Sequence, residues 1–406
     1  MRNAKKIFIA TGFAFLTAHA FCDEGEKLLR FKYKKDENYR VLSTVNETVK
    51  LNGRVHHQSE IVNRVTAKIT DVDEKGRGLN EGNFMTTENT VTTDSNGAFT
   101  LGEEYYSKFW RDELGVYQIE NKYFMPTVRD CPVFPKKAVK PGDSWTGVGH
   151  EAHDLRRLFS SDEPYKVPFT ATYTYLRDEG KFQVIQVKYS LFFESPIPEN
   201  TFRSFEDFPV TTMGFSDQTI WWDNEKGQID HYSENFRIDM ETYSGERLSF
   251  SGKAHAEVSY YERSSTDKQL EKVRDTVKKL DIKDVSVEKT EKGLKISLEN
   301  IQFRPESALL LNSEKAKIEK IAKILEGYSN DLLVSGHTAL SGSEQSCQEL
   351  SEKRANAVAS YLILKGVRDR YHIFTKGFGA KVPIASNDTE EGKAKNRRVE
   401  ITILDK

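Results

Sequence analysis

The chain has 406 residues, with 60 lysines and arginines against 62 aspartates and glutamates and a formal net charge of −2. This balance, with 30% charged and 37% hydrophobic residues, excludes a disordered acidic protein and lacks the basic excess typical of nucleic-acid binding. The length allows two or three domains, and no interior run approaches the roughly 18 apolar residues of a membrane-spanning helix, which excludes a polytopic helical membrane protein.

The first 20 residues have the pattern of a secretory signal peptide. Three basic residues precede an apolar run over residues 7–16, and Ala18 and Ala20 supply the small residues that a signal peptidase reads. We expect residues 1–20 to be removed on export, and an uncleaved anchor is the alternative. Cys22 follows a bulky residue, which disfavours lipid attachment there.

The exported chain has three widely spaced cysteines, Cys22, Cys131 and Cys347. An oxidising compartment permits disulfides, but three such thiols cannot form a dense framework and at least one stays unpaired within the chain. The domains must therefore be stable through their cores.

From Leu28 to about Tyr261, within a predicted domain of residues 21–262, apolar and polar positions alternate with a period of two. Over residues 248–260 every second side chain is apolar or small, and a turn at residues 243–246 separates this stretch from an earlier one of the same kind. The stretches at residues 167–175 and 187–193 repeat the pattern. Successive strands with short turns predict an antiparallel β domain, and their length predicts a curved sheet or partial barrel.

Two properties of this β domain stay open. A transmembrane barrel also alternates, but Glu47 shares a face with valines and Asn63 with aliphatic residues, which favours a soluble sheet. The apolar concave face either packs on a helix or second sheet or encloses a ligand. In pattern alone, the region resembles exported β domains that carry lipoproteins or other apolar ligands.

Residues 263–283 read as a charged helical linker. Capping residues at 264–267 precede a helix over residues 268–280 that has many charges and few apolar positions. This composition indicates a connector.

Residues 284–406 follow a different pattern, in which helices alternate with strands. Short strands are predicted at 285–289 and 294–298, and Ser313 is predicted to cap a helix with one apolar stripe. A short strand at Leu332 to Val334, a helix at Glu344 to Lys365, a strand at His372 to Thr375 and an alternating strand at Val399 to Ile403 follow. This order predicts an α/β sandwich of about 120 residues.

Five motifs in this region carry a resemblance. They are Phe303 with Ser307 and Leu310, Gly336-His337-Thr338, Leu350 to Ala355, Gly377-Phe378-Gly379, and Asn396 to Glu400. In order and spacing, residues 285–406 resemble the OmpA-like peptidoglycan-binding domain. The resemblance implies a periplasmic module that grips the stem peptide of peptidoglycan without covalent chemistry.

In that family an Asp after Gly-His-Thr binds the ammonium of a diaminopimelate and an Arg on the next helix binds its carboxylate. The Arg corresponds to Arg354, beside the apolar stripe of its helix, where a guanidinium needs an anion. That anion is a ligand or an internal carboxylate such as Glu306. The position of that Asp is occupied by Ala339. Three explanations are open: the peptidoglycan that this protein meets has a different residue at that point, another acid such as Glu306 binds the ammonium, or the domain has lost the ability to bind peptidoglycan. The predicted binding residues are Gly336, His337, Thr338, Ala339, Phe303, Glu306, Leu350, Arg354, Asn396, Arg397 and Arg398.

We therefore expect a non-enzymatic, exported envelope protein that anchors to peptidoglycan, in the periplasm and associated with the outer membrane and cell wall. The alternative is a carrier whose β domain binds an apolar ligand or an envelope partner. We expect no nucleic-acid partner, cofactor or metal, because His150 and His153 lack the spacing of known metal motifs and no nucleophile has an evident orienting base.

Overall fold

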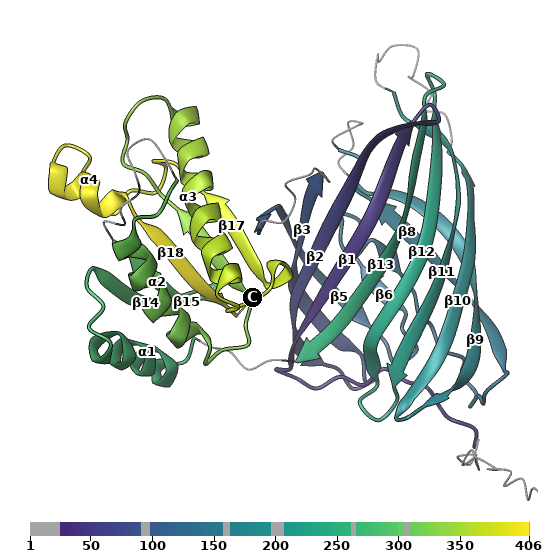
Figure 1. Ribbon diagram of the computed structural model, residues 1–406. Helices are drawn as coiled ribbons and strands as arrows, with labels where there is room; N and C mark the ends of the chain where they lie inside the picture. Colours follow the sequence, from purple (N-terminus) through teal and green to yellow (C-terminus); the bar gives the residue numbers. More distant parts are fainter. Residues whose placement is uncertain are drawn as a thin grey trace, which may run out of the picture.

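The computed structural model describes residues 25–90, 98–156, 163–195, 207–260, 265–299, 301, 303 and 308–405. These residues form a curved antiparallel sheet followed by an α/β sandwich (Figure 1). The predicted signal peptide and Cys22 lie outside the described residues.

The N-terminal sheet has twelve strands in the order β6-β5-β3-β2-β1-β13-β12-β11-β10-β9-β8-β7. They are β1 (Asn38–Leu51), β2 (Arg54–Val72), β3 (Gly78–Thr90), β5 (Glu103–Arg111), β6 (Tyr117–Ile119), β7 (Val128–Arg129), β8 (Ser144–His153), β9 (Tyr165–Glu179), β10 (Phe182–Glu194), β11 (Pro209–Asp223), β12 (Gln228–Thr242) and β13 (Arg247–Tyr260). Neighbouring strands are antiparallel, and β1 pairs with both β2 and β13, so strands from the two ends of this region meet in the middle of the sheet.

The period of two places alternate side chains on opposite faces of the sheet. In β9, Val167, Phe169 and Ala171 are buried and the residues between them are exposed. In β11, Trp222 is fully buried, whereas its neighbour Trp221 is only partly covered. The predicted long-stranded, curved antiparallel sheet is confirmed.

Irregular segments cover part of the concave face, where the sequence suggested a helix or a second sheet. Leu29 and Phe31 of the N-terminal segment and Phe134 of the loop between β7 and β8 are buried in one cluster with side chains of β9, β10 and β11. The rings of Phe31 and Phe134 meet the ring of Trp222 edge-on, with centroids 4.7 and 4.6 Å apart. Aromatic contacts of this kind stabilise a core beyond the area that they bury.

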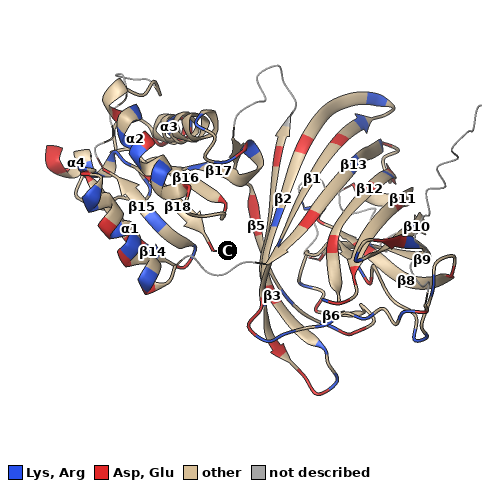
Figure 2. Ribbon diagram, turned by 60° about the horizontal axis from the view of Figure 1, so that its bottom comes forward, with Lys and Arg blue, Asp and Glu red and all other residues tan. Residues whose placement is uncertain are grey.

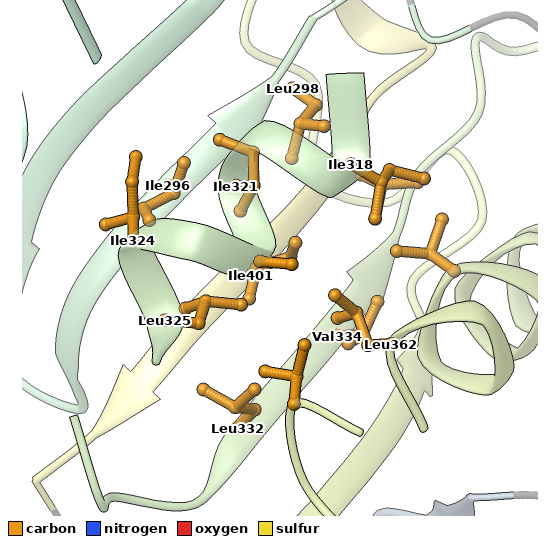
Figure 3. Packing of buried hydrophobic residues seen from close by; sticks show 14 of the residues in the cluster. Ile296, Leu298, Ile318, Ile321, Ile324, Leu325, Leu332, Val334, Leu362 and Ile401 are labelled. Carbon is orange, nitrogen blue, oxygen red and sulfur yellow. The ribbon is translucent and has the colours of Figure 1, made fainter. Parts of the chain in front are cut away.

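The C-terminal unit is the predicted α/β sandwich. Its elements are α1 (Asp267–Lys279), β14 (Val285–Thr290), β15 (Gly293–Leu298), α2 (Asn312–Leu325), β16 (Leu332–Gly336), α3 (Glu344–Leu364), the 3-10 turn Arg370–His372, β17 (Ile373–Gly377), α4 (Glu390–Asn396) and β18 (Val399–Leu404). The apolar stripe of α2 is confirmed, since Ile318, Ile321 and Leu325 are fully buried against the sheet (Figure 3). The helix begins at Asn312, two residues earlier than expected, and Ser313 does not cap it.

Helix α1 is part of this unit, which corrects its interpretation as a connector. Val273 and Val277 are buried in the core of the sandwich. Arg274 donates to the backbone oxygen of Val287, and Gln269 accepts a hydrogen bond from Tyr328. The other faces of α1 have both basic and acidic residues (Figure 2). Because charged residues dominate the helix, its two buried valines were not recognised as core positions from the sequence.

The two units share a strand pairing. The short strand β4 (Phe99–Thr100), which follows β3 in the chain, pairs in parallel with β17 and extends the C-terminal sheet to the order β14-β15-β18-β16-β17-β4. Beside this pairing, side chains of both units form one buried cluster of Val62, Met85, Phe99, Leu333, Phe374 and Leu404. The units are therefore packed together.

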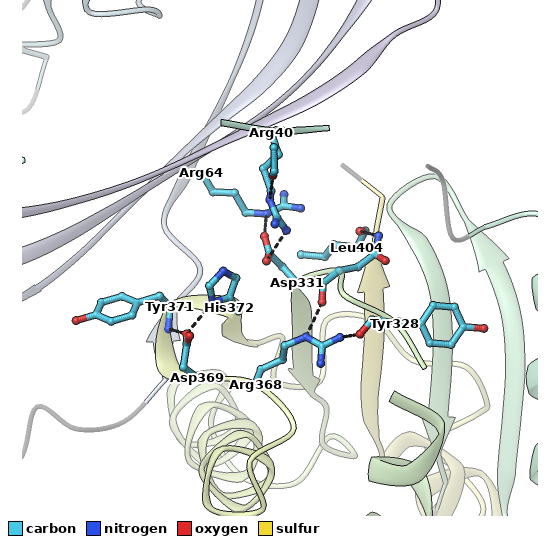
Figure 4. Close-up of polar contacts among 11 residues, drawn as sticks. Arg40, Arg64, Tyr328, Asp331, Arg368, Asp369, Tyr371, His372 and Leu404 are labelled. Carbon is cyan, nitrogen blue, oxygen red and sulfur yellow. Dashed lines mark hydrogen bonds and ion pairs between the residues drawn. The ribbon is translucent and has the colours of Figure 1, made fainter. Parts of the chain in front are cut away.

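Ion pairs complete this interface. Asp331, whose side chain is 0% exposed, accepts hydrogen bonds from Arg40 at 2.7 Å and from Arg64 (Figure 4). Nearby, Glu60 pairs with Arg370 at 2.8 Å and accepts a hydrogen bond from Tyr371 at 2.7 Å.

Within the described residues, no helix combines the length and the apolar character that crossing a membrane requires.

Candidate functional site

The candidate site lies where β16 ends against α3. A Cβ atom on Gly336 would stand 2.1 Å from the backbone oxygen of Ser351, so only glycine lets the strand approach the helix this closely. The loop that follows is held on both sides, because His337 N donates to Arg398 O at 3.0 Å and Thr338 N donates to Gly379 O at 2.9 Å. The Gly-His-Thr motif is thus a fixed turn between β16, β17 and β18.

The side chain of His337 belongs to the interior. It is 3% exposed, and its ring stacks on Phe378 with centroids 5.1 Å apart. Burial lowers the pKa of His337, although the carboxylate of Glu400, 3.5 Å from Nε2, opposes that shift. The ring therefore packs inside the unit and orients the turn.

Among the predicted binding residues, Arg354 has the side chain best placed to bind a ligand. It lies on α3, half-buried, with Cζ 4.9 Å above the ring of Phe303. Its Nε atom is buried without a hydrogen-bond partner, and no described residue forms an ion pair with it. Burial and the positive charge of Arg397 lower its pKa. An unpaired guanidinium in this setting favours an incoming anion.

Arg397 adds a second cationic group to the same region. No described residue accepts a hydrogen bond from its side chain, and its charge acts on Arg354. The hydroxyl of Thr338 is also buried without a partner in the described part of the chain. The predicted residues Ala339, 6% exposed, and Leu350, half-buried, lie in the turn and on α3 respectively, and Glu306 lies outside the described residues.

Asn396 and Arg398 have structural roles. Asn396 is fully buried and accepts hydrogen bonds from Ile384 N at 2.8 Å and Ala385 N at 3.1 Å, which holds the loop before α4. Arg398 is 1% exposed and donates to Glu400 at 2.8 Å and to Val382 O at 3.2 Å. The motif Asn396 to Glu400 therefore builds the wall of the site and presents Arg397 alone.

Three contributing residues were missed from the sequence. Glu400 lies in β18, two positions after Arg398, which directly precedes the strand. In an extended chain this spacing places both side chains on one face, so the sequence already indicated their contact. Phe378, which stacks on His337, belongs to one of the five motifs but was not among the predicted binding residues. Asn387 accepts hydrogen bonds from Leu340 N at 3.2 Å and from Asn396 at 3.0 Å, a link between two loops for which the sequence has no signal.

Glu400 makes the stability of this unit acid-sensitive. Burial alone raises the pKa of Glu400, but His337 and Arg398 outweigh it and lower the pKa to about 2. An unfolded glutamate titrates at about 4.3, so the stabilisation is present above that pH and is lost as pH falls through about 2. We expect Glu400→Gln to be less stable at pH 7, because Arg398 loses its partner, and to show a shallower loss of unfolding free energy between pH 5 and 2. Chemical denaturation across this range measures both effects, and an unchanged slope would contradict the assignment.

The two histidines of β8, His150 and His153, each contact a different carboxylate. His150 Nδ1 lies 3.6 Å from Asp130, and His153 Nε2 lies 2.8 Å from Glu151. No group of three or more potential metal ligands occurs among the described residues. Cys131 and Cys347, one in each unit, form no disulfide with any residue that the structure describes.

The C-terminal unit is thus an α/β sandwich with two cationic side chains, Arg354 and Arg397, in one region. Residues 302–397 match the OmpA family, and this C-terminal part of the chain belongs to that family. The predicted OmpA-like domain is confirmed.

Several characterised proteins are similar to this part of the chain. The probable lipoprotein YiaD of Escherichia coli K12 is 38% identical over 148 residues, which cover 36% of this chain and 64% of YiaD. The peptidoglycan-binding protein ArfA of Mycobacterium tuberculosis H37Rv is 40% identical over 104 residues, 25% of this chain and 32% of ArfA. The chain thus spans about a third to two thirds of the length of these relatives.

A solved outer membrane protein from Borrelia burgdorferi B31 is 45% identical, covers 30% of this chain and 97% of its own, and has a TM-score of 0.26. The periplasmic domain of Helicobacter pylori MotB (residues 78–256) is 28% identical, covers 30% of this chain and 83% of its own, and has a TM-score of 0.28.

Proposed function

We propose that this protein is a non-enzymatic component of the cell envelope that binds peptidoglycan non-covalently through its OmpA-like domain. The single observation that carries the proposal is Arg354, a half-buried guanidinium with no ion pair among the described residues. A carboxylate of a peptidoglycan stem peptide can accept two hydrogen bonds from the guanidinium group.

Two further features support an anionic peptide ligand. Arg397 increases the positive potential at Arg354, and the buried hydroxyl of Thr338 offers an unused hydrogen-bonding group in the adjacent turn. Among the relatives, ArfA is named as a peptidoglycan-binding protein and is 40% identical over the matched residues. Export through the signal-like residues 1–20 would bring the domain to the wall.

Removing the charge of Arg354 tests the proposal. Insoluble peptidoglycan should retain the purified protein, and Arg354→Gln should bind about ten-fold or more weakly, because a charge-assisted hydrogen bond is lost. Lys353→Gln, an exposed neighbour on α3, is the matched control and should bind like the wild type. Sedimentation of the protein with peptidoglycan measures the bound fraction.

The outcome is decisive if the variants stay folded, which thermal unfolding checks. Equal retention of Arg354→Gln and wild type, or no retention of wild type on peptidoglycan of any stem-peptide composition, would refute the proposal. Should Arg354→Gln unfold, Arg397→Gln provides the same test from a residue with no described side-chain partner.

Ala339 determines which stem peptide fits. The turn offers no carboxylate for a ligand ammonium at this position, so recognition in this chain relies on the anionic end of the ligand. Because Ala339 is 6% exposed, Ala339→Asp would bury a charge and lower the melting temperature of the free protein. On peptidoglycan that contains diaminopimelate the same variant should bind more tightly, and weaker binding there would contradict an ammonium site at this turn.

A further inference from the structure

The concave face of the β domain encloses a cavity that no part of the wall-binding site uses. Two adjoining spaces of about 260 Å³ each share Val41, Val65, Phe84, Ile229 and Tyr232 in their linings. Together they reach the size range of roughly 300–1,000 Å³ that is typical of small-molecule sites. The covering segments thus leave unfilled space beneath the sheet.

The first space is apolar and aromatic. Its lining is made mostly of aliphatic and aromatic side chains, among them Ile69, Phe109, Tyr117 and Val258. The hydroxyl of one lining tyrosine, Tyr39, is satisfied by the side chain of Asn80 at 2.9 Å. Such a lining favours the burial of an alkyl chain over that of a polar molecule.

Two cations line this space, and one of them, Lys32, donates from Nζ to the backbone oxygens of Asn224 and Glu225 at 3.0 Å. The other, Arg111, lies among apolar and aromatic side chains. Its Cζ atom is 3.8 Å from the ring centroid of Phe31 and 4.6 Å from that of Tyr117. Its hydrogen bonds go to backbone oxygens, from Nε to Gly115 at 3.1 Å and from Nη2 to Pro132 at 3.3 Å and Cys131 at 3.4 Å. No carboxylate of the described residues forms an ion pair with it, and Nη1 has no described acceptor.

The acidic groups of the cavity lie in other surroundings. Glu37 also lines the first space, but the charges that act on it are those of Lys34 and Lys226. Glu234 lines the second space, accepts hydrogen bonds from Ser216 and Gln218, and burial raises its pKa. An anion is therefore attracted to Arg111 and disfavoured at Glu234, so the anionic group of a ligand would lie at the Arg111 end of the cavity.

We propose that the β domain binds an amphiphile with a single alkyl chain, whose small anionic group lies on Arg111 and whose chain fills the apolar cavity. A carboxylate or phosphate would accept the free Nη1 donor of Arg111, and the chain would displace water from aliphatic and aromatic surface. The same chemistry is available from a free fatty acid and from an alkyl phosphate headgroup. This function is independent of wall binding, because its residues belong to the other unit.

The test uses the purified full protein and a fluorescent fatty acid, 11-(dansylamino)undecanoate, displaced by three twelve-carbon competitors. Dodecanoate, dodecyl phosphate and dodecanol each have twelve carbons, so their alkyl chains differ by at most one carbon and the main difference is the head group. We expect at least one anion to bind about ten-fold or more tightly than dodecanol, the gain of a charge-assisted hydrogen bond. Preference for dodecanoate indicates a fatty acid, and preference for dodecyl phosphate indicates a phosphate head group.

Two variants locate the site. Arg111→Gln should remove the preference for the anion and leave the affinity for dodecanol unchanged, and Arg111→Lys should keep part of the preference. Arg77→Gln is the matched control. Arg77 stacks on Trp110, which directly precedes Arg111 in β5 and therefore points to the opposite face of the sheet. Arg77 also forms an ion pair with Asp73. Binding by Arg77→Gln should equal that of wild type.

Val65→Phe tests the chain-binding half without changing charge. Val65 lines both spaces, so the larger side chain should reduce the affinity for all three competitors. The proposal is overturned if wild type shows no saturable binding of the dansyl probe, if dodecanol competes as well as both anions, or if Arg111→Gln keeps the anion preference. Loss of peptidoglycan binding would leave each of these results unaffected.

Discussion

Replacing Asp331 by alanine is expected to lower the free energy of unfolding by about 3–5 kcal/mol, because it removes the buried carboxylate that binds two largely buried guanidinium groups. The carboxylate of Asp331 is inaccessible to solvent and binds both Arg40 and Arg64 across the interface between the two units (Figure 4). Urea denaturation of the full protein measures the loss. Amide exchange in β17 should also accelerate, since its pairing with β4 depends on the same interface.

The matched control for Asp331 is another interdomain pair. Glu104 lies 3.1 Å from Lys292, and the side chains are 42% and 49% exposed. Exposed pairs contribute little, so Glu104→Gln should change stability by less than about 1 kcal/mol. If Asp331→Ala were as mild as this control, the buried pairing would not hold the units together.

The second large effect is expected at Trp222. Trp222→Ala should destabilise the β domain by about 3–5 kcal/mol, because a fully buried ring in contact with Phe31 and Phe134 leaves a cavity. Trp221→Ala is the matched control in the same strand, since Trp221 stacks on His231 on the opposite, partly exposed face. Far-UV circular dichroism during urea unfolding compares the two variants.

A cost below about 1 kcal/mol for Trp222→Ala, or equal costs at the two positions, would contradict the assignment of the covered face. A large difference would establish that the N-terminal segment and the loop before β8 form an essential part of the β-domain core. These same segments supply Phe31 and Cys131 to the cavity wall, so their packing also determines the shape of the proposed ligand site.

The interface gives the proposed anchoring a mechanical consequence. The two units share a paired strand, an apolar cluster and the ion pairs of Asp331. If the OmpA-like domain binds the wall, the β domain is therefore held against the wall in a defined orientation, and a flexible tether would not achieve this. Export and wall contact would then bring the cavity and its ligand to a fixed place in the envelope.

Local sequence patterns determined the types of element and their order. The period of two in residues 167–175 and 248–260 predicted long strands, and the helical stripe of Ile318, Ile321 and Leu325 predicted the buried face of α2. The motifs around Gly336 and Arg354 predicted the family of the C-terminal unit. These features depend on neighbours within a few positions in the chain, so a sequence read in order contains them.

Only the tertiary structure decided which distant residues meet. Asp331 precedes a short strand and looks like an ordinary loop residue, yet its partners Arg40 and Arg64 lie 291 and 267 positions away. Arg111 ends a strand with no sign that its charge would face an apolar cavity, and Asn396 and Arg398 could not be separated from Arg397 by sequence alone. Burial and pairing of such groups depend on the path of the whole chain, because an isolated charge becomes costly or useful only once distant segments remove water from it.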